Sequence, residues 1–465
     1  MKVFDDDIAM VGMSCIFPQA PNLQAYWENI LNKRNCITDH PSPEAKRVID
    51  PTYEGFERLY SSKGGYLGDL AAFNPLDYGV MPDSIDGADP DHFLALRVAA
   101  EALADAGMAG DNFPRERTDV IVGHGTYVNP GTVNWVQHGV ILDQTLDIIK
   151  QLNPDYTAQE LKEIWTKLRD SLPPLDAQTI PGVIPNIMSG RIANRLDLMG
   201  GNYIIDAACA SSLIAVDHGV KNLLLDRCDV ALVGGVQGCI PPAVVMIFCT
   251  LKAMSRRQAP RPFDADADGT MLGEGVGFLA LKRKKDAVRD GDRIYALIKG
   301  LGIASDGKSQ GLLAPRLDGE TLAVKRAYDA AEVDPHTIEL VEAHGTGIPL
   351  GDATEIKALN NVIGGNGARN RCGIGSVKSM IGHCIPAAGM ASLIKVAMGL
   401  NQKIIPPTNN VDKPHPDLQL DKTPFYISTE TRPWVHGSVS IPRRAGVSSM
   451  GFGGINAHCV LEEFR

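Results

Sequence analysis

A single cysteine stands where an apolar segment ends and a helical pattern begins. Residues 203–216 read YIIDAACASSLIAV: apolar residues stop at Asp206, small residues surround Cys209, and apolar residues then recur at helical spacing. A thiol at the first turn of a helix lies near unpaired N–H groups and the positive end of the helix dipole, which favour the thiolate. This placement suits a nucleophile, although a cysteine between a strand and a helix is, taken alone, more often buried and inert.

Two histidines occupy settings similar to that of the cysteine. His344 lies in EAHGTGIPLGDATE, just after an apolar strand pattern, and His383 lies in SVKSMIGHCIPAAGM, between a strand pattern and a helix of small residues. Active-site residues of α/β folds gather at strand ends, and a nucleophilic cysteine usually needs a histidine close in space. Each histidine alone would be interpreted as structural, but two of them and a cysteine in like settings indicate nucleophilic catalysis.

A glycine-rich segment near the end of the chain is the fourth candidate. Residues 448–458 read SSMGFGGINAH, and Gly451, Gly453 and Gly454 permit backbone shapes that are closed to other residues. Such a loop can aim N–H groups at an oxyanion, and a tight hairpin turn explains it equally well. Phe452 is a bulky residue among the glycines, as a gate would be.

The elements that must position these residues alternate between strand and helix patterns. Strands are expected at 8–11, 118–126, 202–206, 229–234, 276–282, 294–301, 337–347 and 371–379, helices at 89–108, 157–172, 320–332 and 387–400, and two final strands around the glycine loop. The helix at 89–108 is expected to begin at an aspartate cap. This alternation predicts mostly parallel sheets covered by helices. It recurs on either side of about residue 268, which is compatible with two similar halves, although no sequence self-similarity between them is apparent.

Composition excludes several classes of function. The 465 residues are 44% apolar and 22% charged, and the net charge of −10 gives no reason to expect a nucleic-acid partner. No apolar run is long enough to span a membrane, and the acidic N-terminus does not resemble a signal peptide, so a cytoplasmic protein is expected. The nine cysteines form no C-x-x-C pair, which argues against a zinc or redox motif.

Taken together, the four pieces resemble the β-ketoacyl synthase (ketosynthase) family of fatty-acid and polyketide synthases. They are DAACASSL, EAHGTG with a following GD, KSMIGH with a following AAG, and GFGGINAH, in this order along nearly the whole chain. The resemblance implies the thiolase fold, an α/β fold of two similar halves in a five-layer αβαβα sandwich, usually as a homodimer. Residues 1–465 would then be one ketosynthase domain with halves at about 1–268 and 269–465 and a helical insertion near 145–175.

Within the family, the chain looks most like ketosynthase domains of iterative type I megasynthases, such as polyunsaturated fatty acid synthases. We therefore expect an excised domain of a longer protein, with a free-standing enzyme as the alternative. The resemblance implies an acyltransferase in which Cys209 accepts an acyl chain. Malonyl-acyl carrier protein then loses CO₂, and its enolate attacks the acyl-cysteine in a Claisen condensation. No metal or bound cofactor is implied, since the phosphopantetheine arm comes with the carrier protein.

The resemblance also assigns roles to further residues. His344 and His383 would donate hydrogen bonds to the extender thioester. The backbone N–H groups of Cys209 and Phe452 would form the oxyanion hole, with Phe452 and Gly453 in the gate. The supporting residues would be Lys378, paired with Glu355, and Asp352 and Glu355 as organisers of the network. Capping of a helix from about residue 353 is an equally good account of these two acids. Thr346 matches a threonine that contacts the phosphopantetheine arm.

The chain departs from the family pattern at several positions. Ile348 replaces a second threonine, which puts one pantetheine contact in doubt. Cys384, Ile385 and Pro386 stand where small or polar residues are commoner, and Met450 replaces a phenylalanine. Because Cys209, His344 and His383 are all present, we do not infer a loss of activity, and altered selectivity for the substrate or the carrier protein is the hypothesis.

Alternative interpretations remain open at this point. A thiolase or a chalcone-synthase-like enzyme would share the fold, but KSMIGH before AAG argues against both. A non-elongating module that passes acyl chains on, or tunes chain length, would rest only on the unusual residues near Ile348 and Ile385–Pro386. A cysteine hydrolase is a more distant alternative. Two basic clusters, one at 252–261 and one at 282–285 (KRKK), are explained either as ordinary charged surface or as docking sites for an acidic carrier protein.

Overall fold

The computed structural model describes residues 7–41, 43–50, 52–53, 58–110, 113–125, 129–308, 311–365, 370–436 and 440–465. In these ranges an 11-stranded sheet has the order β12-β10-β9-β14-β15-β8-β1-β7-β6-β4-β5. Its strands are β1 (Ile8–Ile16), β4 (Thr118–His124), β5 (Asn202–Ile205), β6 (Val230–Gln237), β7 (Gly275–Arg283), β8 (Ala296–Ser305), β9 (Leu340–Glu342), β10 (Cys372–Gly375), β12 (Phe425–Ile427), β14 (Arg444–Gly451) and β15 (Ile455–Glu462).

The sheet consists of two arms with the same topology, joined by a short antiparallel pairing of β1 with β8. The first arm has the order β5-β4-β6-β7-β1, and the second has the order β10-β9-β14-β15-β8, with β12 added beyond β10. In each arm the first three strands are parallel and the remaining pairings are antiparallel. The two halves expected from the sequence are therefore present as a repeat of topology. They divide between β7 and β8, later than the expected boundary near residue 268, because β7 completes the first arm.

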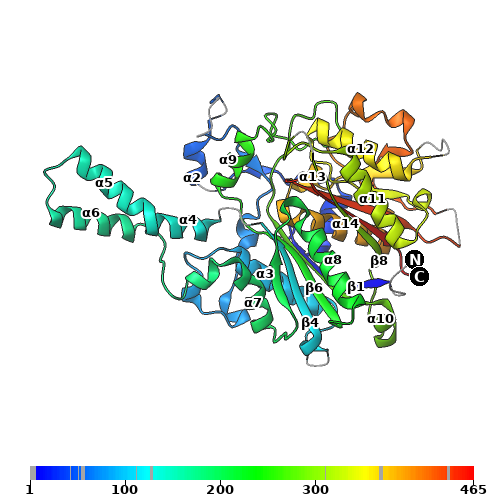
Figure 1. Ribbon diagram of the computed structural model, residues 1–465, viewed down its shortest axis with the longest axis horizontal. Coiled ribbons are helices and arrows are strands. Elements are labelled where there is room, and N and C mark those ends of the chain that lie inside the picture. Colours follow the sequence, from blue (N-terminus) through cyan, green and yellow to red (C-terminus); the bar gives the residue numbers. More distant parts are fainter. Residues whose placement is uncertain are drawn as a thin grey trace.

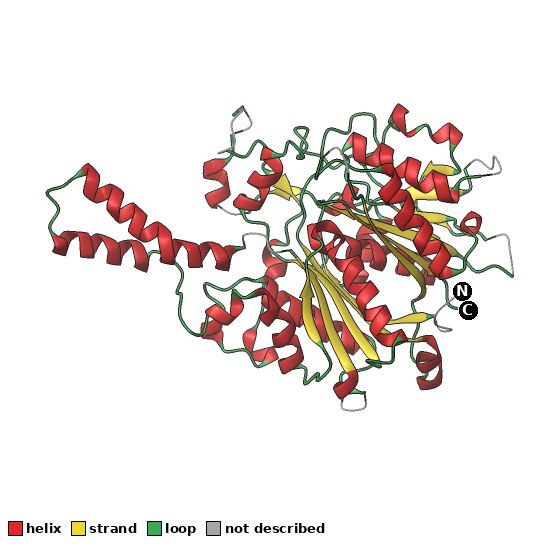
Figure 2. Ribbon diagram, in the orientation of Figure 1, coloured by secondary structure: helices red, strands yellow, loops and turns green. Residues whose placement is uncertain are grey.

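Helices lie between the two arms and on their outer faces, which gives five layers (Figures 1 and 2). α8 (Ser211–Leu224) follows β5, α14 (Ala388–Gln402) follows the β10 region, and the two pack against each other between the arms. α3 (Asp91–Asp105) and α7 (Pro185–Arg195) cover the first arm, while α11 (Leu317–Ala331) and α12 (Pro349–Ile363) cover the second. The expected αβαβα sandwich is confirmed.

The central helix α14 is enclosed on every side. All its residues from Ala388 to Leu400 are buried, as expected for a helix that is apolar around its whole circumference. Its one charged residue there, Lys395, forms a buried ion pair with Glu342 at 2.6 Å. The core around this helix combines side chains from both halves, so neither half completes its packing alone.

A helical arm projects from the body at one side (Figure 1). It consists of α4 (Pro130–Val136), a π-helical segment (Gln137–Ile141), α5 (Leu142–Leu152) and α6 (Ala158–Asp170), so the insertion begins before the expected residue 145. Thr157 and Glu160 form a capping box at the start of α6. The expected aspartate cap of α3 is wrong: Pro90 stands at that position, and the carboxylate of Asp89 accepts a bond from Gly131 N in α4 instead.

The remaining α-helices and strands of the described residues are short. They are α1 (Leu23–Leu31), α2 (Pro43–Val48), α9 (Pro242–Thr250), α10 (Lys284–Asp290) and α13 (Lys378–Ile381), and the strand pairs β2 (Thr38–Asp39) with β3 (Lys63–Gly64) and β11 (Ile404–Ile405) with β13 (Arg432–Pro433). Among the helices in the described ranges, none has the length and apolar character needed to cross a bilayer.

Candidate active site

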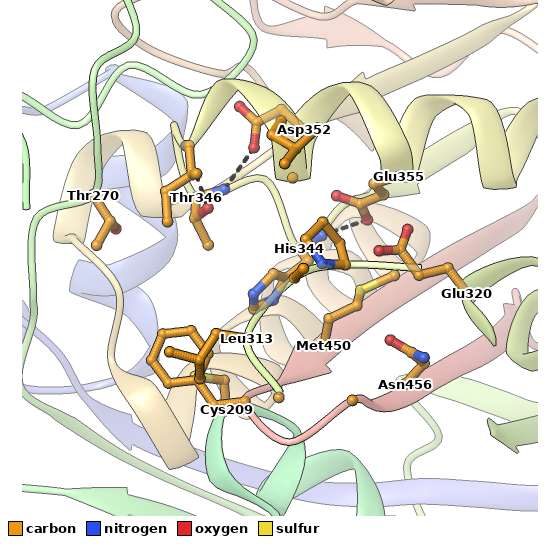
Figure 3. Close-up of a pocket in the computed structure, with 18 of the residues that line it drawn as sticks. Cys209, Thr270, Leu313, Glu320, His344, Thr346, Asp352, Glu355, Met450 and Asn456 are labelled. Atoms are coloured by element: carbon orange, nitrogen blue, oxygen red, sulfur yellow. Dashed lines mark hydrogen bonds between the residues drawn. The ribbon is translucent and has the colours of Figure 1, made fainter. Parts of the chain in front are cut away.

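A cavity of about 230 Å³ brings the predicted cysteine and both predicted histidines together. Cys209 comes from the turn between β5 and α8, His344 follows β9, and His383 lies between α13 and α14. The turn between β14 and β15 closes one side of the cavity with Gly451, Phe452 and Gly454. Figure 3 shows the Cys209 and His344 side chains in this cavity, with Glu355 and Asp352 on the helix above His344.

The turn that carries Cys209 is held in a strained conformation. Ala208 has φ +49°, a left-handed value that costs a residue with a Cβ atom about 1–2 kcal/mol. The Asp206 carboxylate accepts a bond from Ala208 N at 3.0 Å, and Ser211 Oγ donates to Ala208 O at 2.6 Å. Ser449 Oγ, from β14, donates to the carbonyl of Cys209 at 2.7 Å. These bonds fix the sulfur at the start of α8.

Burial outweighs the groups that were expected to favour the thiolate of Cys209. The residue is only 3% exposed, and burial raises the pKa of its thiol to about 12. The charge of Lys378 and hydrogen bonds from the N–H groups of Phe452 and Cys209 itself lower this pKa, but by less. The resting group is therefore a thiol, and it needs a base when it attacks. The two N–H groups that face the sulfur are those assigned to the oxyanion hole.

The two histidines form a neutral pair. Their rings meet edge to face, with centroids 5.3 Å apart and an interplanar angle of 89°. Burial holds the pKa of each far below its usual range, and the positive charge of Lys378 lowers both further. Within the described part of the chain, Nδ1 of each ring is buried and has no hydrogen-bond partner. Neutral imidazoles of this kind can donate an N–H to a substrate oxygen or accept a proton.

Two carboxylates hold the backbone of the His344 loop. Glu355 accepts bonds from His344 N at 2.7 Å and Gly345 N at 2.9 Å, and Asp352 accepts from Thr346 N at 3.0 Å and Gly347 N at 3.3 Å (Figure 3). Gly345 and Gly347 have φ +35° and +83°, which favour glycine. Helix α12 begins at Pro349, before the expected residue 353, so Asp352 is an acid of its first turn, and neither acid is the N-cap, which is Ile348. They bind the loop, as organisers of the site would.

His383 is fixed through its backbone and is followed by a second strained turn. Its N–H donates to Met271 O at 2.6 Å, and its carbonyl accepts from Gly273 N at 3.0 Å. Ile385 is fully buried and has φ +46°, a conformation that is unfavourable for a β-branched residue. The sequence departure at Ile385 and Pro386 therefore forms a rigid 3₁₀ turn next to His383.

The expected direct ion pair between Lys378 and Glu355 does not form, although the charge of Glu355 still acts on Lys378. Among the described residues, no ion pair within 4 Å joins them, because Glu355 uses both oxygens to hold the His344 loop. Lys378 is buried, and burial lowers its pKa, while the charges of Glu342 and Glu355 raise it. Lys378 thus acts on the site through space.

The glycine loop and the mouth of the cavity are only partly as expected. The Phe452 ring packs 5.7 Å from the Phe248 ring, so the expected gate rests on α9. Gly453 does not line the cavity; its N–H donates to Leu312 O at 3.2 Å, which ties the turn to the mouth. Thr346 and Ile348 both line the cavity, together with Leu312 and Leu313.

Sequence reasoning missed four polar residues of the cavity: Thr270, Asp306, Glu320 and Asn456. Asp306 follows β8, and its Oδ1 accepts from Asn456 Nδ2 at 2.7 Å. Asp306 and Glu320 lie in SDGK and RLDGE, letters that are typical of turns and helix starts. A usable signal for Glu320 is its place on the buried face of α11, where a carboxylate is unusual.

The basic cluster KRKK is a structural feature. Lys282 pairs with Asp290 and Asp292, and Arg283 pairs with Asp229 and Asp286. In the other cluster Arg261 pairs with Asp264 and Asp412, while Arg256 lies over the Tyr60 ring. These contacts favour the interpretation of the 252–261 cluster as ordinary charged surface and of KRKK as the charged end of β7, where Lys282 and Arg283 are buried.

Family models and known proteins match almost all of the chain. Residues 5–287 match the family model "Beta-ketoacyl synthase, N-terminal domain" and residues 295–412 match the corresponding C-terminal domain, so the models meet where the two sheet arms divide. A polyunsaturated fatty acid synthase component of Thraustochytrium sp. is 35% identical over 99% of this chain, and 6-methylsalicylic acid synthase of Penicillium patulum is 34% identical over 99%. The chain spans only 16% and 24% of these two relatives.

Solved structures agree with these matches. The ketosynthase from module 6 of the bacillaene synthase of Bacillus subtilis 168 has a TM-score of 0.82 at 33% identity, and the match covers 99% of this chain and 72% of that one. The oxazolomycin ketosynthase domain of Streptomyces albus JA3453 has a TM-score of 0.84 at 29% identity, covering 99% and 74%.

Proposed function

Because this chain belongs to the β-ketoacyl synthase family, we propose that it lengthens an acyl chain by decarboxylative Claisen condensation. An acyl thioester transfers its acyl group to Cys209, and a malonyl unit on an acyl carrier protein then loses CO₂ and attacks the acyl-cysteine. One observation carries the proposal: a buried thiol, two backbone N–H groups that face it and two neutral imidazoles line the same cavity.

In the first step the Cys209 thiol attacks the carbonyl carbon of the acyl thioester. Its proton must leave, because a group with a pKa of about 12 is protonated at neutral pH. A neutral imidazole in the cavity accepts this proton and returns it to the departing pantetheine thiolate. The N–H groups of Cys209 and Phe452 stabilise the oxyanion of the tetrahedral intermediate.

In the second step the malonyl carboxylate leaves as CO₂ and its bonding electrons form the enolate. The N–H groups of His344 and His383 stabilise the enolate oxygen. Burial and the nearby Lys378 charge lower the pKa of both rings and keep them neutral. Each ring therefore retains one unprotonated nitrogen, and neither becomes a buried imidazolium. The enolate carbon then attacks acyl-Cys209, a carbon–carbon bond forms, and the Cys209 thiolate leaves and takes up a proton from solvent.

The mouth of the cavity fits a carrier-bound arm. The Thr346 hydroxyl and the apolar walls at Leu312, Leu313 and Ile348 suit a phosphopantetheine chain of amides and methylenes. The arm supplies the thiol that carries the extender unit. We further propose that the protein is a cytoplasmic homodimer. Its substrates would be fatty or polyketide acyl groups, because the matched relatives are fatty acid and polyketide synthases. A module that only passes acyl chains on is not favoured, because it would not need two neutral histidines at the thiol.

Intact mass of the protein after incubation with a short acyl-pantetheine thioester tests the first step. We expect a gain of one acyl group in the parent and no gain in Cys209→Ala. Acylation of Cys209→Ala would show that Cys209 is not the acyl acceptor. Absence of loading in the parent across several chain lengths would contradict the proposed function.

A further inference from the structure

Glu320 is a buried carboxyl group without a partner in the cavity of Cys209 and His344. It lies near the start of α11, is 3% exposed and lines the cavity. Throughout the described ranges no hydrogen bond or ion pair to its side chain is present, and its Oε2 is fully buried and unpartnered. Figure 3 shows Glu320 reaching the site from a different element than the His344 loop. A buried polar group of this kind is costly to retain unless a ligand completes it.

The neighbours of Glu320 decide which carboxyl group keeps a proton. Burial raises the pKa of Glu320 to about 9, and the charges of Glu355 and Asp306 contribute. Burial also raises the pKa of Glu355, but bonds from Gly345 N and His344 N and the charge of Lys378 lower it. Since Glu320 has no such bonds, the proton stays on Glu320. At neutral pH it is an uncharged acid whose O–H is available as a donor.

The chemistry of the cavity leaves one substrate group unassigned. The proposed function gives the acyl carbonyl the N–H groups of Cys209 and Phe452, and gives the extender thioester oxygen the two histidines. The carboxylate of the extender unit has no donor among these residues. It is an anion that enters a cavity with two neutral rings and the acids Glu355 and Asp306, so it needs a donor that is itself uncharged or positive.

We propose that Glu320 recognises the extender carboxylate by donating its O–H to it, and so selects malonyl-type units over simple acyl thioesters. This inference rests on the proposed function and adds a specificity-determining residue to it. A hydrogen bond between a neutral acid and a carboxylate is short and charge-assisted. The bond is lost when CO₂ forms, so it strengthens binding of the extender and does not accelerate the chemical step.

Three variants and one kinetic separation test the proposal. Glu320→Leu removes the donor, Glu320→Gln keeps an uncharged donor, and Asp318→Asn on the exposed side of the same helix is the control. With malonyl-carrier as the probe, we expect Glu320→Leu to raise KM about 10- to 100-fold, with kcat unchanged within a few-fold and normal acyl loading of Cys209. Glu320→Gln and Asp318→Asn should stay close to the parent.

The pH profile gives a second readout that does not depend on the leucine variant. Above pH 9 Glu320 ionises and repels the extender carboxylate, so the parent's KM rises, while that of Glu320→Gln stays flat. Lys378, Glu355 and Asp306 are the same in both proteins, so the difference isolates Glu320.

Two results would overturn the proposal. One is a Glu320→Leu enzyme that loads normally and keeps the parent's KM for malonyl-carrier, or loses only kcat. The other is an alkaline rise in KM that is equal in the parent and Glu320→Gln. Failure of acyl loading in the parent would instead contradict the proposed function.

Discussion

His124 and His344 stand at equivalent places in the two arms of the sheet. β4 and β9 each lie between two parallel neighbours, and the letters His-Gly-Thr begin at the last residue of β4 (124–126) and two residues after the end of β9 (344–346). Thr126 lies outside the described residues. The two histidines therefore begin from the same position in a repeated scaffold.

The carboxylate beside each histidine is placed differently. Asp91 Oδ2 lies 2.8 Å from Nε2 of His124, so that carboxylate holds the ring. Glu355 bonds to the backbone of His344 and leaves the ring free to face the cavity. A strand end alone therefore does not make a catalytic histidine. A carboxylate on the ring makes the residue structural, whereas a carboxylate on the backbone fixes the position and leaves the imidazole for substrate.

Of the two histidines compared, loss of the His344 ring should have the greater consequence for catalysis. His344→Ala should reduce condensation roughly 100- to 1,000-fold, because a donor to the enolate oxygen is lost. Acyl loading of Cys209 should fall much less than condensation, because His383 remains to accept the thiol proton, and the thermal unfolding temperature should change little. Steady-state condensation rates beside intact-mass loading measure this, and a variant that condenses at the parent's rate would remove His344 from the mechanism.

For His124, the histidine of the other arm, we expect a loss of stability with little change in catalytic rate. His124→Ala leaves the Asp91 carboxylate buried without its ring partner and should lower the free energy of unfolding by about 1–3 kcal/mol. Denaturant unfolding measures this, and the rate per folded enzyme should stay within a few-fold of the parent. A large rate loss with unchanged stability would show that His124 is not the structural counterpart of His344.

Removal of the Lys378 charge tests what keeps His344 and His383 neutral. The positive charge lowers the pKa of both rings, so Lys378→Met should raise both pKa values and move the acid limb of the condensation profile to higher pH. Activity is lost as pH falls, because protonated rings have no unprotonated nitrogen left. An acid limb that stays in place, measured from kcat against pH, would mean that burial alone sets the neutral state.

A modest change is expected at the residue two positions after His344. Thr346→Val removes one hydroxyl from the cavity mouth and should raise KM for the carrier substrate a few-fold, with kcat retained. Titration with malonyl-carrier measures this. An unchanged KM would show that the carrier arm does not use this hydroxyl.

Much of this site could be predicted from local patterns. The junction at Cys209, the glycine settings of His344 and His383 and the alternation of strands and helices are all visible in the letters, because backbone conformation depends on nearby residues. The repeat of His-Gly-Thr at 124–126 and 344–346 predicts nothing from the sequence alone. It becomes informative only when the sheet topology shows that β4 and β9 occupy equivalent positions.

Features that depend on three-dimensional burial could not be predicted. The helix terminus at Cys209 favours a thiolate, but the depth of the cavity decides the pKa of the thiol. Glu355 is expected from the sequence to pair with Lys378, but both of its oxygens are used by the His344 loop. The place of Glu320 on the buried face of α11 could have drawn attention to it, but only the cavity reveals that its carboxyl group has no partner.

The proposed condensation can be tested in one experiment by following a single acyl group through the cavity. The enzyme is loaded with a short acyl group, mixed with malonyl-carrier, and the carrier products are weighed by mass spectrometry. The mechanism predicts a β-ketoacyl-carrier longer by two carbons from the parent and from His124→Ala, with little from His344→Ala and none from Cys209→Ala. An acyl group that stays on Cys209 while malonyl-carrier remains intact would contradict it.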